Sequence, residues 1–93
     1  MEREKLHELA IETGRRLAQG GVSLATAESC TGGWIAKVMT DIPGSSGWFD
    51  RGFVTYTNQA KQDMLGVQAD TLQQHGAVSE QTVREMANGA LCN

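Results

Sequence analysis

The sequence predicts an α/β fold in which helices cover both faces of a parallel sheet. Stretches with the spacing of amphipathic helices alternate with two stretches that have the composition of strands. The first of these strands, residues 22–27 (VSLATA), carries no charged residue on either of its alternating faces. Strands of this kind are usually covered on both sides, as they are in parallel sheets. With 93 residues, the chain is expected to form a single domain, residues 1–93.

The first half of the chain is predicted to contain a helix, this strand and a second helix. Apolar residues at helical spacing predict the first helix over about 3–19. A glycine pair follows it, and glycine tolerates the positive φ of a helix C-cap. After the strand, the helical pattern resumes at Thr31 and stops at Pro43, because proline cannot continue a helix.

The second half is predicted to contain one strand and three helices. Residues 48–57 (WFDRGFVTYT) are rich in aromatic and β-branched residues and predict the second strand. Asn58 is expected to cap a short helix, and residues 69–76 to form another helical turn. Ser79 is expected to cap the last helix. The buried stripe of that helix is predicted to comprise Val83, Met86, Ala87, Ala90 and Leu91.

Composition indicates a globular chain with no nucleic-acid or membrane partner. The net charge is −3 and charges of both signs are interspersed, so no basic stripe is available to replace phosphate counterions. The amino terminus lacks the apolar core of a signal peptide, and no apolar run approaches the ~20 residues that span a bilayer. Cys30 and Cys92 form neither a disulfide framework nor a metal-ligand spacing. We therefore expect a reduced, cytoplasmic protein.

The turn in residues 26–33 (TAESCTGG) crowds polar and glycine residues between the first strand and the next helix. The first amides of a helix have no backbone partner and carry the positive end of its dipole. Gly32 and Gly33 leave these amides open to a ligand, so the turn suits an oxyanion or a phosphate. Ser29 lies at the carboxyl end of the strand, where open α/β sheets usually bind ligands, and is a candidate nucleophile.

A serine nucleophile needs a base, and the sequence offers no conventional triad. His7 falls in the first helix, and His75 precedes a glycine at a helix end, where it is expected to cap. The better candidate is Lys61, about one turn into the helix after the second strand, with Tyr56 near the carboxyl end of that strand. If the strands are parallel, these side chains can meet Ser29 at one edge of the sheet. A lysine acts as a base only where burial lowers its pKa toward neutrality.

Each of these residues also has a structural interpretation. Ser29 can be the N-cap of the following helix, and Lys61 can be a solvated surface charge. Cys30 can itself be the nucleophile, but a buried structural thiol is the expectation, because no histidine lies nearby to form the thiolate. The glycine pair is weak evidence for phosphate binding, because the P-loop lysine spacing is absent. Spacing by itself leaves the function open.

Longer stretches of the chain resemble the CinA carboxyl-terminal domain family, whose members include nicotinamide mononucleotide deamidases. The matching stretches run in family order from about Leu24 to Ala90: TAESCTGGWIAKVMTDIPGSSGWF, GFVTYTNQAKQDMLGV, LQQHGAVSE and EMANGA. The combination of AESCTGG, PGSS and YTNQAK is specific, and its chance assembly is improbable. For PGSS we expect a helix stop with a turn, and for HGAVS a turn with a cap.

The resemblance implies a three-layer α/β/α sandwich with a mostly parallel sheet, of which this chain corresponds to the first half. It also implies a metal-independent amidohydrolase without a cofactor, which converts nicotinamide mononucleotide to nicotinate mononucleotide and ammonia in pyridine nucleotide salvage. By the same resemblance, Ser29 is the nucleophile, with Tyr56 and Lys61 as its proton-transfer partners in either order. The residues implied for the oxyanion and substrate are Cys30, Thr31, Gly32 and Gly33.

The chain departs from the family in length. Family domains are considerably longer, and their second half supplies further strands and a glycine-rich loop near the substrate. An open sheet edge and an uncovered face therefore remain in the expected fold. The chain is either a fragment or needs a partner chain to complete its core, and we expect a homo-oligomer. Two other interpretations stay open: a non-catalytic nucleotide-binding or interaction module, and an inactive piece of the enzyme.

Overall fold

A parallel pair of strands, β1 (Leu24–Glu28) and β2 (Phe49–Val54), forms the sheet of the protein. The computed structural model describes residues 2–93, and within this range the sheet has these two strands. The register runs from Leu24 opposite Phe49 to Glu28 opposite Val54, with one irregularity after Leu24. The carboxyl ends of β1 and β2 therefore lie side by side. The α/β class and the parallel sheet predicted from the sequence are confirmed.

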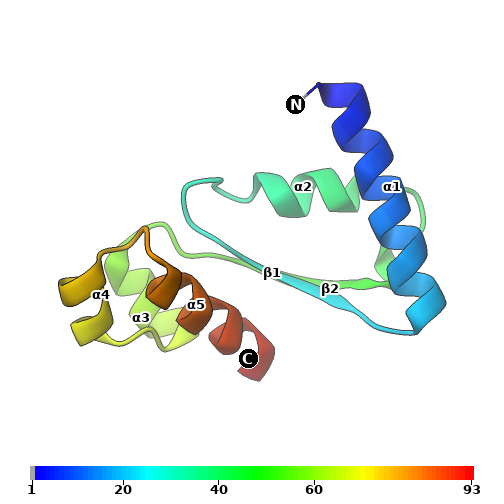
Figure 1. The fold of residues 1–93 in the computed structure, drawn as a ribbon. Coiled ribbons are helices and arrows are strands. Elements are labelled where there is room, and N and C mark those ends of the chain that lie inside the picture. Colours follow the sequence, from blue (N-terminus) through cyan, green and yellow to red (C-terminus); the bar gives the residue numbers. More distant parts are fainter. Residues whose placement is uncertain (1) are drawn as a thin grey trace.

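One face of the sheet is covered by α1 (Arg3–Gly20) and α2 (Trp34–Thr40), as Figure 1 shows. α2 packs on both strands, and α1 packs on α2. A turn of 3-10 helix, Ser45–Gly47, then leads into β2, so the PGSS stretch is a helix stop with a turn, as predicted. Because α1 precedes β1 and α2 follows it, this layer fixes where the chain enters β1 and where it leaves the strand.

The other face is covered by α3 (Asn58–Leu65), α4 (Ala69–His75) and α5 (Glu80–Cys92). α5 packs on β1, and both α3 and α4 pack against α5. Within the described range no helix is long and apolar enough to cross a membrane. The two helical layers lie on opposite sides of β1 and β2 in Figure 1.

Each face of the sheet has its own apolar cluster, because successive residues of a strand point to opposite faces and the irregularity after Leu24, where Asp50 has no partner in the register, shifts this alternation along β2. Leu24 and Phe49 pack against the cluster under α1 and α2, whereas Ala27 and Phe53 pack against the cluster under α5. The buried members of the first cluster are Ala10, Met39, Ile42 and Trp48. Those of the second are Leu65, Val67, Leu72, Met86 and Ala90.

The helix caps agree with the sequence in one case and differ in another. Ser79 Oγ accepts the N–H of Thr82 at 3.2 Å, which confirms it as the cap of α5. The predicted cap of α3 was wrong, because Thr57 Oγ1, not Asn58, accepts the N–H of Ala60, at 3.0 Å. The chain is still extended at Thr57, so its side chain can turn back to the first amides of the helix.

The strands and α2 are shorter than predicted. β1 begins at Leu24 rather than at residue 22, and β2 ends at Val54, before the predicted end at residue 57. α2 begins at Trp34 rather than at Thr31, because the intervening residues form a turn. The shortening leaves polar residues in irregular backbone at the end of each strand.

The predicted buried stripe of α5 is only partly correct. Met86 and Ala90 are buried, as predicted. Val83 and Leu91 are 59% and 82% exposed, and Ala87 is exposed as well. The prediction was wrong for these three residues, because helical periodicity marks an apolar face without showing how much of it the described chain covers.

Close packing of α5 on α3 depends on Gly89. A Cβ atom at this position would lie 2.8 Å from Leu65 Cα and closer still to the Leu65 carbonyl, which belongs to rigid backbone. We predict that Gly89→Ala lowers the free energy of unfolding by about 1–3 kcal/mol, as overpacking does elsewhere. Urea unfolding followed by circular dichroism measures the change.

Gly20→Ala is the matched control. Its Cβ would meet only Val22 Cγ2, at 3.8 Å, so the substitution is expected to leave stability within about 1 kcal/mol of the parent chain. Equal effects of the two substitutions would contradict the packing argument.

Candidate active site

The turn between β1 and α2 has the positive backbone φ angles that its two glycines predict. Gly32 and Gly33 have φ values of 62° and 99°, a region that side chains with a Cβ rarely adopt. The Gly32 N–H donates to the carbonyl of Ser29 at 3.0 Å, which closes the turn. The turn places Ser29, half-buried, directly after the last residue of β1.

Glu28 is a structural centre of this region that the sequence analysis did not identify. Its side chain is 3% exposed, and its carboxylate accepts hydrogen bonds from Thr31 Oγ1 at 2.7 Å, Ile35 N at 2.9 Å and Ala36 N at 3.0 Å. The first amides of α2 are therefore bound by a carboxylate of the protein itself. An acidic residue just before a glycine-rich turn is the only sequence signal of this contact.

The same contact narrows the set of oxyanion donors. The Gly32 amide donates to the Ser29 carbonyl, and the Gly33 amide is one of the backbone groups that lower the pKa of the Glu28 carboxyl group. Of the turn residues named in the sequence analysis, Cys30 and Thr31 remain as backbone donors for a ligand.

The protonation of Glu28 follows from its surroundings. Burial raises the pKa of its carboxyl group, but the hydrogen bonds from Thr31 and from the amides of Ala36, Ile35 and Gly33 outweigh burial. The net pKa lies below the usual range, so Glu28 is ionised at neutral pH. Its negative charge lies at the positive end of α2.

Lys61 is buried beneath the ends of the strands. Its side chain is 1% exposed, and its Nζ donates to the carbonyls of Thr55 at 2.9 Å and Tyr56 at 3.0 Å. Thr55 in turn donates its N–H to the carbonyl of Glu28 at 2.8 Å. Hydrogen bonds thus connect Lys61 through Thr55 to the residue that precedes Ser29. The interpretation of Lys61 as a solvated surface charge was wrong.

Tyr56 has the opposite environment to Lys61. It follows the end of β2 and is 70% exposed. The structure therefore presents one exposed candidate and one buried, hydrogen-bonded candidate near the same strand end.

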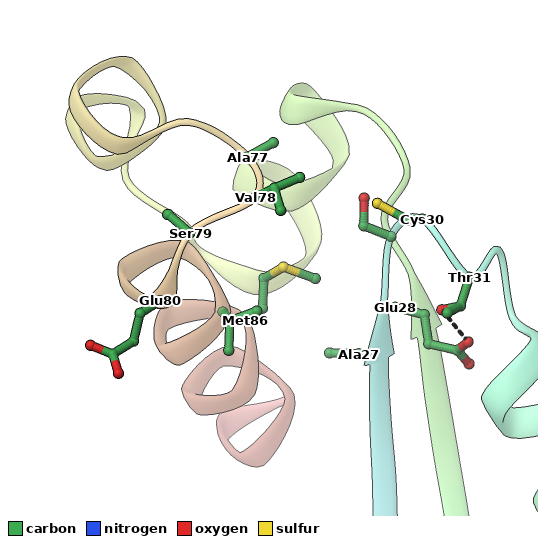
Figure 2. Close-up of a pocket in the computed structure, with 11 residues that line it drawn as sticks. Ala27, Glu28, Cys30, Thr31, Ala77, Val78, Ser79, Glu80 and Met86 are labelled. Carbon is green, nitrogen blue, oxygen red and sulfur yellow. Dashed lines mark hydrogen bonds between the residues drawn. The ribbon is translucent and has the colours of Figure 1, made fainter. Parts of the chain in front are cut away.

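A cavity of about 480 Å³ opens beside the end of β1. Figure 2 shows Ala27, Glu28, Cys30 and Thr31 on one side of it, and the loop before α5 with Met86 on the other. Ser29 also lines this cavity, whereas Tyr56 and Lys61 do not. The structure therefore brings Ser29, Cys30 and Thr31 to one cavity, without placing the two proton-transfer candidates in its wall.

The opposite wall of the cavity is formed by residues 77–80, within the HGAVSE stretch. A turn with a cap was predicted here and is confirmed, but its position across from Ser29 was not predicted. That position depends on how α5 packs on β1, and no local sequence pattern predicts this packing. The wall includes Val78, whose side chain is 84% exposed.

Cys30 is exposed rather than buried, so the expectation of a buried structural thiol was wrong. The chain leaves the sheet at this point and turns outward, which brings the residue to the surface of the turn. Among residues 2–93, no group of three or more His, Cys, Asp and Glu side chains is placed to hold a metal ion.

Comparison with known protein families shows which family the chain belongs to. Residues 6–93 match the family model described as the CinA C-terminal domain. The chain belongs to the CinA C-terminal domain family.

Related proteins carry the names of both an enzyme and a damage-inducible protein. Nicotinamide-nucleotide amidohydrolase PncC of Escherichia coli (strain K12) is 61% identical over 87 residues, which are 94% of this chain and 53% of that protein. The protein of the same name from Enterobacter agglomerans is 60% identical over 91 residues, 98% of this chain and 56% of that protein. The chain thus spans about half the length of these curated relatives.

A solved structure has the same arrangement of elements. The crystal structure of competence/damage inducible protein CihA from Agrobacterium tumefaciens superposes with a TM-score of 0.91 at 55% identity. The match covers 94% of this chain and 53% of that chain.

The Glu28 carboxylate predicts a pH dependence of stability. Its pKa is lower in the folded chain than in the unfolded chain, so its stabilisation is complete above the unfolded value of about 4.3 and is lost as the pH falls through the folded value. We predict that Glu28→Gln costs about 1–3 kcal/mol at pH 7 and that this difference shrinks in acid. Thermal unfolding from pH 7 to pH 3 measures both.

Glu8→Gln is the control, because Glu8 is exposed on α1. It is expected to follow the parent chain at every pH. A gap between Glu28→Gln and the parent chain that stays constant down to pH 3 would refute the role of the ionised carboxylate.

Proposed function

We propose that this chain carries the nucleophile-bearing half of an amidohydrolase site that converts the carboxamide of nicotinamide mononucleotide to a carboxylate. The names of the PncC relatives support the reaction and the substrate. The position of Ser29, at the carboxyl end of β1 and on the cavity, supports its role as the nucleophile.

The burial of Lys61 is the observation that carries the proposal. Its Nζ donates to two carbonyls, which leaves one further position on the nitrogen. In the uncharged amine that position is a lone pair that accepts a proton, and in the ammonium it is an N–H that donates one. An amine held in this way can serve first as base and then as acid.

The proposed reaction proceeds through an acyl-enzyme. Ser29 Oγ attacks the amide carbon while Lys61 or Tyr56 takes its proton, and the amides of Cys30 and Thr31 bind the oxyanion. The C–N bond then breaks, the same pair returns the proton to the departing ammonia, and water hydrolyses the ester. Because Lys61 and Tyr56 do not line the cavity, the proposal requires the turn or the exposed Tyr56 ring to shift when substrate binds.

Glu28 argues against the alternative of a phosphate cradle at this turn. A phosphate at the N-terminus of α2 would compete with a carboxylate that already accepts the Ile35 and Ala36 amides. It would also lie beside a buried negative charge, which is unfavourable. The turn suits a neutral group that becomes an oxyanion during the reaction better than it suits a dianion.

Replacement of the nucleophile tests the proposal. We join this chain to the remainder of Escherichia coli PncC, so that the domain has the length of its relatives, and measure ammonia release from nicotinamide mononucleotide. Ser29→Ala is expected to lower the rate by about 10³-fold or more, because loss of a nucleophile removes the covalent route. Ser23→Ala, an exposed serine before β1, is the control and is expected to retain the parent rate. Undiminished release from Ser29→Ala would reject Ser29 as the nucleophile.

The proton-transfer roles are tested by Lys61→Met and Tyr56→Phe in the same joined chain. Methionine fills the buried volume without an amine, so Lys61→Met is expected to fold and to lose about 10²–10⁴-fold in rate. The larger of the two losses identifies the group that contacts the serine proton. Parent rates in both variants, with unchanged circular dichroism, would contradict the proposed pair.

A further inference from the structure

Val78 presents an exposed apolar side chain to the cavity beside Ser29. It is 84% exposed, the highest value among the large apolar side chains of residues 2–93. In Figure 2 it lies across the cavity from Cys30, and Ser29 lines the same cavity. A single exposed apolar residue is ordinary on a protein surface. The significance of Val78 therefore depends on how it is held and on what it faces.

The loop that carries Val78 is held in place by the residues on both sides of it. Ala77 packs against the apolar cluster under α5. Ser79 Oγ and Thr82 Oγ1 both donate to the carbonyl of Gly76, at 3.0 Å and 2.8 Å, and Thr82 is fully buried. Valine has a restricted χ1 angle because its side chain is branched at Cβ. The Val78 side chain is therefore oriented at the cavity before any ligand arrives.

The cavity suits a flat ring better than it suits a phosphate. Within residues 2–93, no Lys, Arg or His lines it. Its two acidic residues are Glu28, whose carboxylate is bound by Thr31 and α2, and Glu80, which is exposed and lies 3.5 Å from the Arg84 guanidinium. A phosphate would meet only negative charge here, whereas the cationic pyridine ring of nicotinamide mononucleotide would not be repelled.

The size of the cavity agrees with this choice. Its volume of about 480 Å³ lies within the range of roughly 300–1,000 Å³ that is common for small-molecule sites. Apart from Glu28 and Glu80, the lining residues are apolar or carry a small hydroxyl or thiol group. The base end of a nucleotide therefore fits the cavity, with its phosphate outside.

We propose that Val78 packs against the face of the pyridine ring of the substrate and so directs its carboxamide toward Ser29. The inference rests on the proposed function and adds a specificity-determining contact to it. Met86 lines the same cavity from α5, and its thioether offers the ring a second apolar contact. Because the loop is already ordered, the contact costs little conformational entropy. It is made in the bound substrate and in the transition state alike, so it contributes to affinity rather than to the chemical step.

Equilibrium binding tests the proposal in the chain joined to the remainder of Escherichia coli PncC. The joined chain carries Ser29→Ala so that nicotinamide mononucleotide is not consumed, and isothermal titration calorimetry measures its Kd. Val78→Ala is expected to raise this Kd about three- to tenfold, because it removes two methyl groups from the ring contact. With Ser29 intact, Val78→Ala is expected to raise KM by the same factor and to leave kcat within about twofold.

Val22→Ala is the matched control. It removes the same two methyl groups from a side chain that is 55% exposed and lies outside the cavity, so the Kd is expected to stay at the parent value. Circular dichroism of Val78→Ala should match that of the parent chain, because Val78 is exposed.

Four outcomes would overturn the inference. These are an unchanged Kd in Val78→Ala, an equal rise in Val22→Ala, no measurable binding by the parent chain, and a parallel loss of affinity for ribose 5-phosphate, which lacks the ring. An unchanged Kd with a lowered melting temperature would show that Val78 packs against the rest of the joined chain instead. Loss of the Val78 contact leaves Ser29 as the proposed nucleophile, whereas undiminished turnover by Ser29→Ala rejects the proposed function whatever Val78 does.

Discussion

The buried carboxylate of Glu28 is the contact on which the rest of the site depends. Its side chain binds the turn through Thr31 and the first amides of α2, while its backbone carbonyl accepts the N–H of Thr55. One residue therefore joins the end of β1 to α2 on one side and to the chain after β2 on the other. A buried carboxylate is tolerated only when hydrogen-bond donors replace the water it has lost. Here the donors belong to the turn and to the first residues of α2, so the same hydrogen bonds hold these segments in place. Ser29 takes its position from this arrangement.

The environments of Lys61 and Tyr56 divide the proposed chemistry between a buried, hydrogen-bonded group and an exposed one. Lys61 is held by two carbonyls beneath the strand ends, so its nitrogen is oriented before any ligand arrives. Tyr56 is largely exposed and has to be ordered by what binds beside it. A preorganised donor loses little entropy in the reaction, whereas a solvated ring can close over a substrate. The pair thus combines a preorganised amine with a ring that can close over the substrate, both near the end of β2.

The sequence was sufficient for features that depend on neighbouring residues. The uncharged faces of the first strand predicted a parallel sheet, and Ser79 was placed correctly as a helix cap because its partner, Thr82, is close in sequence. The partners of Glu28 lie seven and eight residues further along, across a turn whose geometry no periodicity specifies. Burial of Lys61 and the wall formed by residues 77–80 depend on how α3 and α5 pack. The exposure of Val83 shows that an apolar stripe predicts a covered face without identifying what covers it.

The separation of the apolar clusters onto opposite faces of the sheet has a consequence for how the molecule opens. Within residues 2–93, the cluster under α1 and α2 and the cluster under α5 share no buried residue. The two clusters are separated by β1 and β2, whose residues contact both. Such layers behave as distinct cooperative units, each with its own local opening free energy. The layer of α3, α4 and α5 can therefore fluctuate away from the strands while α1 and α2 stay folded. One wall of the cavity belongs to β1 and the turn after it, and the other belongs to α5 and the loop before it, so a movement of α5 relative to β1 would change the width of the entrance to Ser29.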